Sequence, residues 1–177
     1  MLGGAGVAVL APGAGTAQSG GADVEILNFA LGLERLQAAF YARAIDEGAI
    51  DGDLLEFARV AAQHEAAHVE ALVAILGADA AGEPELDFGD ATSSPEAFLR
   101  AAVGLEDLGV DAYNGQAANL TPRALATTAA IASVDARHAA WIRSLAGRVP
   151  AAKPVDAGRP AGEIEAAVAA TGFVVQP

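Results

Sequence analysis

Apolar side chains recur at every third or fourth position along four long stretches of the chain. This spacing predicts helices with one apolar face that packs against a core. The first predicted helix covers residues 23–48, the second covers 51–77, the third begins at residue 94, and the fourth covers 121–147.

Residues typical of helix starts precede three of these stretches. Asp23 stands before the first apolar positions as a candidate N-cap. Ser94 and Pro95 supply an N-cap and a proline at the first helical position, and Thr121 and Pro122 repeat that order. We therefore expect helices to begin at these points.

The lengths of the connections define how the helices are arranged. Only a few residues join the first helix to the second and the third to the fourth, so each pair forms an antiparallel hairpin. A helix of about 24 residues is roughly 36 Å long, and sixteen extended residues reach roughly 50 Å. The connection 78–93 can therefore cross the whole bundle. The predicted fold is an all-α four-helix bundle, residues 22–147, made of two hairpins joined by a long crossover.

The two ends of the chain differ from this bundle in composition. Residues 1–21 are small, apolar and uncharged, and they resemble the apolar core of an export signal without its basic start. That interpretation places the protein in the periplasm, the cell envelope or outside the cell. A disordered glycine- and alanine-rich leader, with a cytoplasmic location, is the alternative. No segment is long and apolar enough to span a bilayer.

The C-terminal tail, residues 148–177, is interrupted by proline and glycine. We expect one short helix at about 162–170. The apolar run at 173–175 that follows it is expected to pack back against the bundle.

Charge and cysteine content limit the chemistry. The chain carries 23 acidic and 10 basic residues, for a net charge of −13, which disfavours nucleic acid and anionic membranes as partners. An acidic surface instead attracts cations. The chain has no cysteine, so carboxylates and the 3 histidines are the side chains available to hold a metal.

The two hairpins contain a repeated motif. The first helix has Gly-Leu-Glu-Arg-Leu around Glu34 and then Tyr41; the third has Gly-Leu-Glu-Asp-Leu around Glu106 and then Tyr113. In both, the tyrosine follows the acid by seven residues. The second and fourth helices each contain an acid and, three residues later, a histidine. The acids of a hairpin are 31 residues apart in the first and 29 in the second.

This spacing places six polar side chains at one height of the bundle. The midpoint between the two acids of each hairpin falls in its turn, so these acids lie opposite each other near mid-helix. All six interrupt apolar stripes that face the core. They are Glu34, Glu65, His68, Glu106, Asp135 and His138.

Four carboxylates cannot all remain ionised in an apolar core, because desolvation and mutual repulsion raise their pKa values. Two divalent cations would balance their four negative charges, and two neutral imidazoles would complete the ligand set. Oxygen and imidazole ligands suit iron, with manganese as an option. The pattern therefore predicts a site for two iron ions.

The chain resembles the ferritin-like superfamily, in particular its bacterial exported, desiccation-related branch. The similarity covers about residues 23–175 and includes the start of the first helix, Glu34 with Phe40 and Tyr41, and the run around His138. The resemblance implies a ferritin-like bundle in which the six residues named above are the metal ligands. It also implies O₂ or H₂O₂ as the reacting partner, in ferroxidase or peroxide-detoxifying chemistry during stress. Asp135 departs from the family pattern, which has glutamate there.

Three alternatives stay open. A non-catalytic exported scaffold that protects during desiccation would keep this fold with a relict site. The run His64-Glu65-Ala66-Ala67-His68 also matches the H-E-x-x-H motif of zinc metalloproteases, although it leaves the second hairpin unexplained. The hydroxyls of Tyr41 and Tyr113 can lean back towards the site, or these residues are core tyrosines with other partners. The sequence selects no oligomeric state.

Overall fold

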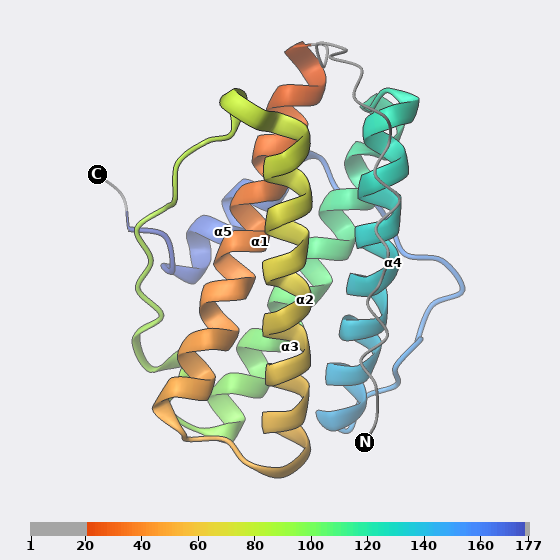
Figure 1. Cartoon of the computed structure of the whole chain (residues 1–177). Helices are drawn as coiled ribbons and strands as arrows, with labels where there is room; N and C mark the ends of the chain where they lie inside the picture. The colour runs from red at the N-terminus through yellow and green to blue at the C-terminus, as the bar shows by residue number, and fades with distance from the viewer. Residues whose placement is uncertain (1–20, 176–177) are drawn as a thin grey trace, which may run out of the picture.

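The structure, a computed structural model, describes residues 21–175, and within them the regular elements are helices (Figure 1). The leader predicted at 1–21 lies almost wholly outside this range. The long helices are α1 (Gly21–Glu47), α2 (Gly52–Leu76), α3 (Pro95–Gln116) and α4 (Pro122–Leu145), and the tail forms α5 (Ala161–Thr171). Short 3₁₀ turns are η1 (Gly77–Asp79), η2 (Gly89–Thr92) and η3 (Ala117–Asn119).

The architecture is the predicted bundle of two hairpins. α1 packs antiparallel to α2, α3 packs antiparallel to α4, and the crossover runs along the outside of α1 from one end of the bundle to the other (Figure 1). None of the helices in residues 21–175 is long and apolar enough to cross a membrane.

Of the predicted N-caps, Ser94 is confirmed and Asp23 is wrong. The Ser94 hydroxyl accepts a hydrogen bond from the Ala97 amide, as an N-cap should. Asp23, in contrast, is not an N-cap, because α1 begins at Gly21. Its buried carboxylate instead accepts hydrogen bonds from the amide (3.0 Å) and hydroxyl (2.5 Å) of Thr121, just before α4. Asp23 therefore ties the start of α1 to the turn between α3 and α4.

Polar side chains of α1 fasten the crossover. One guanidinium nitrogen of Arg35 lies 2.6 Å from the carbonyl oxygens of both Ala81 and Gly82. Two turns earlier on α1, Asn28 donates to the Asp79 carbonyl (2.9 Å) and accepts from the Ala81 amide (2.7 Å). The arginine of the first Gly-Leu-Glu-Arg-Leu motif thus holds the connection between the hairpins.

The C-terminal segment packs against the crossover, as expected. Leu86 and Val174 form an isolated antiparallel bridge, and the Asp87 amide donates to the Phe173 carbonyl at 2.9 Å. The ring of Phe173 lies edge-on to Phe88, with centroids 5.3 Å apart. The last described residues therefore cover α1 and the crossover together.

A close backbone approach explains one of the helical glycines. A Cβ atom on Gly115 in α3 would lie 1.9 Å from the carbonyl oxygen of Arg159. The tail passes there because the Arg159 amide donates to the Asp111 carbonyl at 3.0 Å. Only glycine lets the segment before α5 lie against α3.

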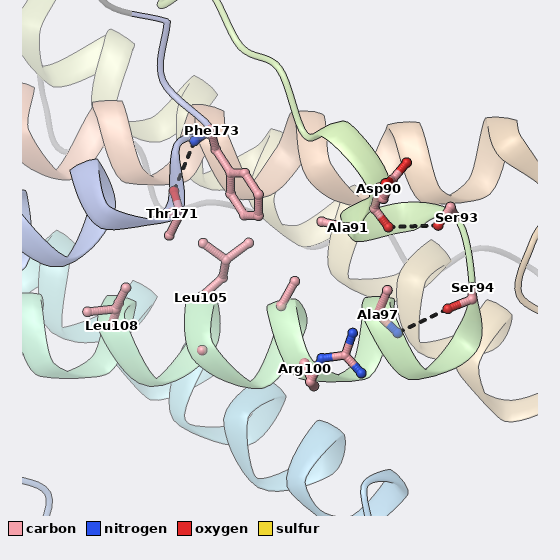
Figure 2. A pocket seen from close by; sticks show the side chains of 12 residues that line it. Asp90, Ala91, Ser93, Ser94, Ala97, Arg100, Leu105, Leu108, Thr171 and Phe173 are labelled. Carbon is pink, nitrogen blue, oxygen red and sulfur yellow. Dashed lines mark hydrogen bonds between the residues drawn. The ribbon is translucent and has the colours of Figure 1, made fainter.

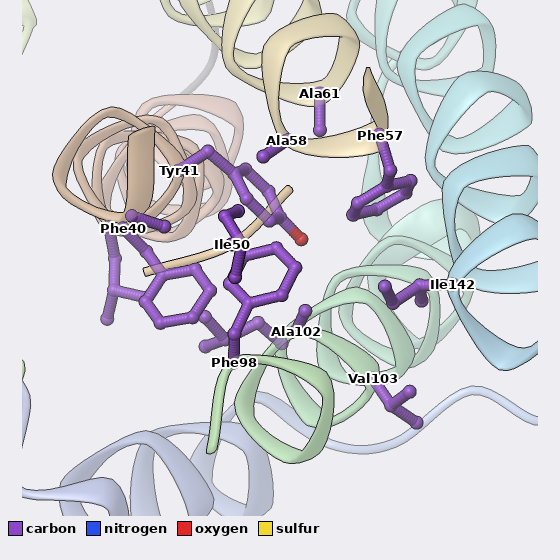
Figure 3. Packing of buried hydrophobic residues seen from close by; sticks show 13 residues of the cluster. Phe40, Tyr41, Ile50, Phe57, Ala58, Ala61, Phe98, Ala102, Val103 and Ile142 are labelled. Atoms are coloured by element: carbon purple, nitrogen blue, oxygen red, sulfur yellow. The ribbon is translucent and has the colours of Figure 1, made fainter. Parts of the chain in front are cut away.

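Two apolar clusters fill the bundle, one towards each end. The cluster towards the α1–α2 turn is aromatic: Phe40 and Phe98 stack at 5.6 Å, and Phe57 lies edge-on to Tyr41 (Figure 3). The other cluster is built from aliphatic residues of α1, α2 and α4 such as Leu31. The layer between the two clusters contains the six polar side chains.

Candidate metal centre

All six predicted site residues meet in this middle layer. The four carboxylates are fully buried, and the two histidines are 8% and 3% exposed. One side chain comes from each of α1 and α3, and two come from each of α2 and α4. The polar residues that interrupt the apolar faces of the four helices at one height therefore form a single buried cluster.

The first half of the cluster surrounds the imidazole of His68. Its Nδ1 atom lies 2.8 Å from Glu65, 3.1 Å from Glu34 and 3.5 Å from Asp135. One donor atom of each of these four residues lies within 4.8 Å of the others, a grouping able to hold a metal ion.

The second half surrounds His138. Its Nδ1 atom lies 2.9 Å from Oε1 of Glu65 and 3.7 Å from Oε2 of Glu106, and these three residues form the second grouping able to hold a metal ion. Glu65 belongs to both groupings and turns one oxygen towards each histidine. It is therefore the residue that the two groupings share.

The two tyrosines of the repeat cross between the hairpins. Tyr41 of α1 donates its hydroxyl to Glu106 of α3, and Tyr113 of α3 donates to Glu34 of α1 at 2.5 Å. Each tyrosine thus contacts the acid of the opposite hairpin, and the alternative of core tyrosines with other partners is excluded. Figure 3 shows the Tyr41 hydroxyl pointing inwards between α2 and α3. Burial raises the pKa of both phenols, so they stay protonated donors.

The cluster holds most of the unpaired polar atoms in the described part of the chain. Such atoms are costly in a folded protein unless a ligand or water completes them. Of six buried side-chain atoms without a hydrogen-bond partner in residues 21–175, five belong to this cluster. They are Oε1 of Glu65, Oε2 of Glu106, both carboxylate oxygens of Asp135 and Nδ1 of His138.

Burial favours the protonated form of three of the carboxyls when no cation is bound. Burial raises the pKa of Glu34 to about 8 and that of Asp135 to about 9, and the negative charge of Glu65 adds to both shifts. Glu34 and Asp135 are therefore mostly neutral at pH 7. Burial and Glu65 likewise raise the pKa of Glu106 well above its usual range.

The fourth carboxyl and its histidine form an ion pair. Burial alone would raise the pKa of Glu65, but the neighbouring imidazoles of His138 and His68 outweigh it and bring the pKa to about 2. Burial alone would lower the pKa of His68, but its hydrogen bonds to Glu34 and Glu65 outweigh that and raise it to about 10. In the metal-free cluster, the negative charge of Glu65 therefore lies beside the positive charge of His68.

His64, which we treated as the extra histidine of the H-E-x-x-H motif, belongs to neither grouping. Its Nδ1 atom lies 2.9 Å from Nε2 of His138, and the two rings stack with centroids 5.1 Å apart. Burial and the neighbouring His138 lower the pKa of His64, so its ring is neutral at pH 7. The zinc motif therefore does not bring His64 and His68 to one shared position.

Sequence reasoning missed one residue beside the cluster, Gln37. It lies three residues after Glu34, is 2% exposed, and donates to the Leu105 carbonyl at 3.5 Å. A Cβ atom on Gly109 would lie 3.5 Å from this amide and 3.9 Å from Asp135. The sequence feature that could have identified Gln37 is its spacing, because a polar residue three positions after Glu34 lies one helical turn from that predicted ligand.

The surface also has a hollow of about 630 Å³, but it lies away from the cluster (Figure 2). It is formed by η2, the first half of α3 and the end of α5. Phe173 and Leu105 face it from two sides, and Arg100 lies at its edge. No residue of the carboxylate cluster lines it, so the chemistry of the cluster does not extend to this surface.

The comparisons with known proteins agree with the fold. The family model of the ferritin-like domain matches residues 22–148, so the chain belongs to the ferritin-like family. No curated protein matches the chain. The family and the buried carboxylate–histidine cluster together are compatible with a metal-binding ferritin-like protein.

Proposed function

We propose that this protein holds two iron ions, or manganese, in the buried cluster and that it is a di-metal oxidoreductase reacting with O₂ or H₂O₂. The observation that carries the proposal is the set of five unpaired donor atoms that converge from two groupings sharing Glu65. Oxygen and imidazole donors in these numbers suit iron and manganese.

The residues divide between two metal positions. Glu34, His68 and Asp135 would hold the first, Glu106 and His138 would hold the second, and Glu65 would bridge the two. Asp135 is one methylene shorter than the glutamate of the family pattern and belongs only to the grouping around His68. The second position therefore has fewer protein ligands than the first.

Two bound Fe(II) ions would supply one electron each, which together reduce O₂ to peroxide or H₂O₂ to water with two protons from solvent. The chain's own residues set the conditions for that chemistry. Tyr41 and Tyr113 orient the carboxylates of Glu106 and Glu34 through their hydroxyls. The apolar clusters on either side exclude bulk water from the layer. Ferroxidase or peroxide-consuming activity, in protection against stress at an exported location, follows as the proposed role.

A single purification tests this proposal. Protein prepared without chelators should contain about two iron or manganese ions per chain by elemental analysis. Loaded anaerobically with Fe(II), it should consume about one H₂O₂ for every two Fe(II) oxidised. Glu65→Ala should lose most of both metals, whereas Gln63→Ala, an exposed change on the same helix, should keep them. An empty protein with no peroxide consumption would support the alternative of a non-catalytic desiccation scaffold. One zinc per chain would support the protease.

A further inference from the structure

His64 has a position that the two metal positions do not explain. It is an exposed residue on α2, immediately before the bridging Glu65, yet its ring covers the buried His138. The interplanar angle is 15°, and the Nδ1 atom of His64 lies 2.9 Å from Nε2 of His138. This is the distance of a hydrogen bond between the two rings.

The orientation of His138 defines what that hydrogen bond does. Its Nδ1 atom faces Glu65 and Glu106, so Nδ1 is the ligand atom towards the second position. A neutral imidazole that binds through Nδ1 carries its hydrogen on Nε2. With a metal on Nδ1, that hydrogen would therefore lie between the two rings, and Nδ1 of His64 would accept it.

The other histidine of the site has no equivalent support. His68 also turns Nδ1 towards carboxylates. Among residues 21–175, however, no third histidine stacks on it: its ring contact is with His138, at 6.5 Å and tilted by 32°. Any effect of His64 on metal binding should therefore fall on one position of the two.

We infer that His64 is a positioning residue for the second metal position: by accepting a hydrogen bond from His138, it fixes the tautomer and ring orientation of that ligand. The inference rests on the proposed dinuclear site. Partners of this kind, which bond to the far nitrogen of a metal-bound histidine, typically change metal affinity by about 10–100-fold when removed.

Cobalt(II) titration of the metal-free protein tests the inference without any turnover. Affinity and stoichiometry come from calorimetry and visible absorption. Proton NMR of the loaded protein in water shows the hyperfine-shifted N–H signals of the bound histidines. His64→Ala removes the acceptor, and His64→Asn places an amide oxygen near the position of Nδ1. Gln63→Ala is the matched control on the same exposed face.

In the wild type we expect two cobalt ions per chain and two shifted N–H signals. His64→Ala should weaken one ion by about 10–100-fold and lose one signal to exchange with water. His64→Asn should restore both, and Gln63→Ala should match the wild type.

Two results would overturn the inference. If His64→Ala binds two cobalt ions as the wild type does and keeps both signals, His64 has no positioning role, while the dinuclear site stands. If the wild type itself binds no cobalt, the proposed function and this inference fail together.

Discussion

Tyr41, on the first helix, donates its hydroxyl to Glu106, on the third. Seven residues separate each tyrosine of the repeat from the acid of its own helix, but the hydrogen bond goes to the acid of the other hairpin. The repeat therefore creates two crossed contacts of the same kind around one buried layer. A change in one helix should be detected at the metal position of the other hairpin.

Phenylalanine substitutions test this crossing. Tyr41→Phe removes the donor to Glu106, so it should weaken cobalt binding at the position held by His138, by about tenfold. Tyr113→Phe should weaken the position held by His68. The spectra of His68→Ala and His138→Ala identify each position. The crossed hydrogen bonds have no functional role if Tyr41→Phe instead weakens the position held by His68 and Tyr113→Phe weakens the position held by His138.

The metal-free protein should be less stable at higher pH. The pKa values of Glu34 and Asp135 are about 8 and about 9 in the fold, compared with the ordinary values of 4.5 and 3.8 that apply in the unfolded chain. The folded cluster thus keeps protons that the unfolded chain releases, and stability falls as pH rises from about 4.5 to about 9. The stability that His68 contributes is present below 6.5 and is likewise lost as pH rises through about 10.

Thermal melts of chelated protein check this dependence. We expect a melting temperature several degrees higher at pH 5.5 than at pH 8.5. Below pH 4.5 the trend reverses, because the unfolded chain then binds a proton at Glu65 that the fold, where the pKa of Glu65 is about 2, does not bind. Glu34→Gln should flatten the fall between pH 5.5 and 8.5. A melting temperature that rises over that interval would contradict the protonated state of the cluster.

Metal binding should release protons. At pH 7 the empty cluster carries protons on Glu34, Asp135 and His68, whose pKa values are about 8, 9 and 10. Ligands bind in their deprotonated forms. Calorimetric titrations in buffers of different ionisation enthalpy should therefore show about three protons released as two divalent cations bind, and more if Glu106 is protonated as well. Fewer than one would mean that the cluster is ionised before binding.

Paired substitutions of Glu34 and Glu106 separate charge from hydrogen bonding. Changing both to Gln removes the acids but keeps an acceptor for Tyr113 and Tyr41, so the protein should stay folded and lose metal binding. Changing both to Leu leaves two buried hydroxyls unpaired, at a cost of about 1–3 kcal/mol each. Denaturant titrations should therefore rank the Gln pair as the more stable. The opposite order would show that the tyrosine contacts contribute little.

Gly115 and Gly104 make a matched pair of helical glycines on α3. Gly115→Ala places a methyl group against the Arg159 carbonyl and should detach the segment before α5, whereas Gly104 has open space around it. Gly104→Ala should raise stability by about 0.5–1 kcal/mol, because alanine favours the helix. Hydrogen exchange should show faster amides near Arg159 in Gly115→Ala alone.

Much of the fold and the convergence of the site follow from local pattern. The apolar period and the Gly and Pro positions predicted the four helices to within a few residues, since both act through short-range geometry. The equal acid spacing placed the six side chains at one height, because the turns lie midway between them.

The contacts that the sequence did not reveal depend on geometry between helices. Asp23 looked like a local cap, but its carboxylate reaches Thr121, which is 98 residues away. His64 matched the H-E-x-x-H motif in sequence, but its contact with His138 of α4 depends on how α2 is rotated. The hydrogen-bond partners of the two tyrosines could not be predicted for the same reason. A side chain directed towards the N-terminus of its helix has a predictable height in the bundle, but the neighbouring helix it contacts is not predictable from sequence.

The candidate metal ligands come from both hairpins, so metal binding would link the two halves of the chain. Each metal position draws side chains from both hairpins, through Glu65 on one side and Asp135 or His138 on the other. A bound ion would therefore act as a cross-link between the halves. A chain cut within the crossover would give two fragments, one for each hairpin. These fragments should bind each other with higher affinity as the metal concentration rises, and neither fragment alone should bind the metal as the intact chain does.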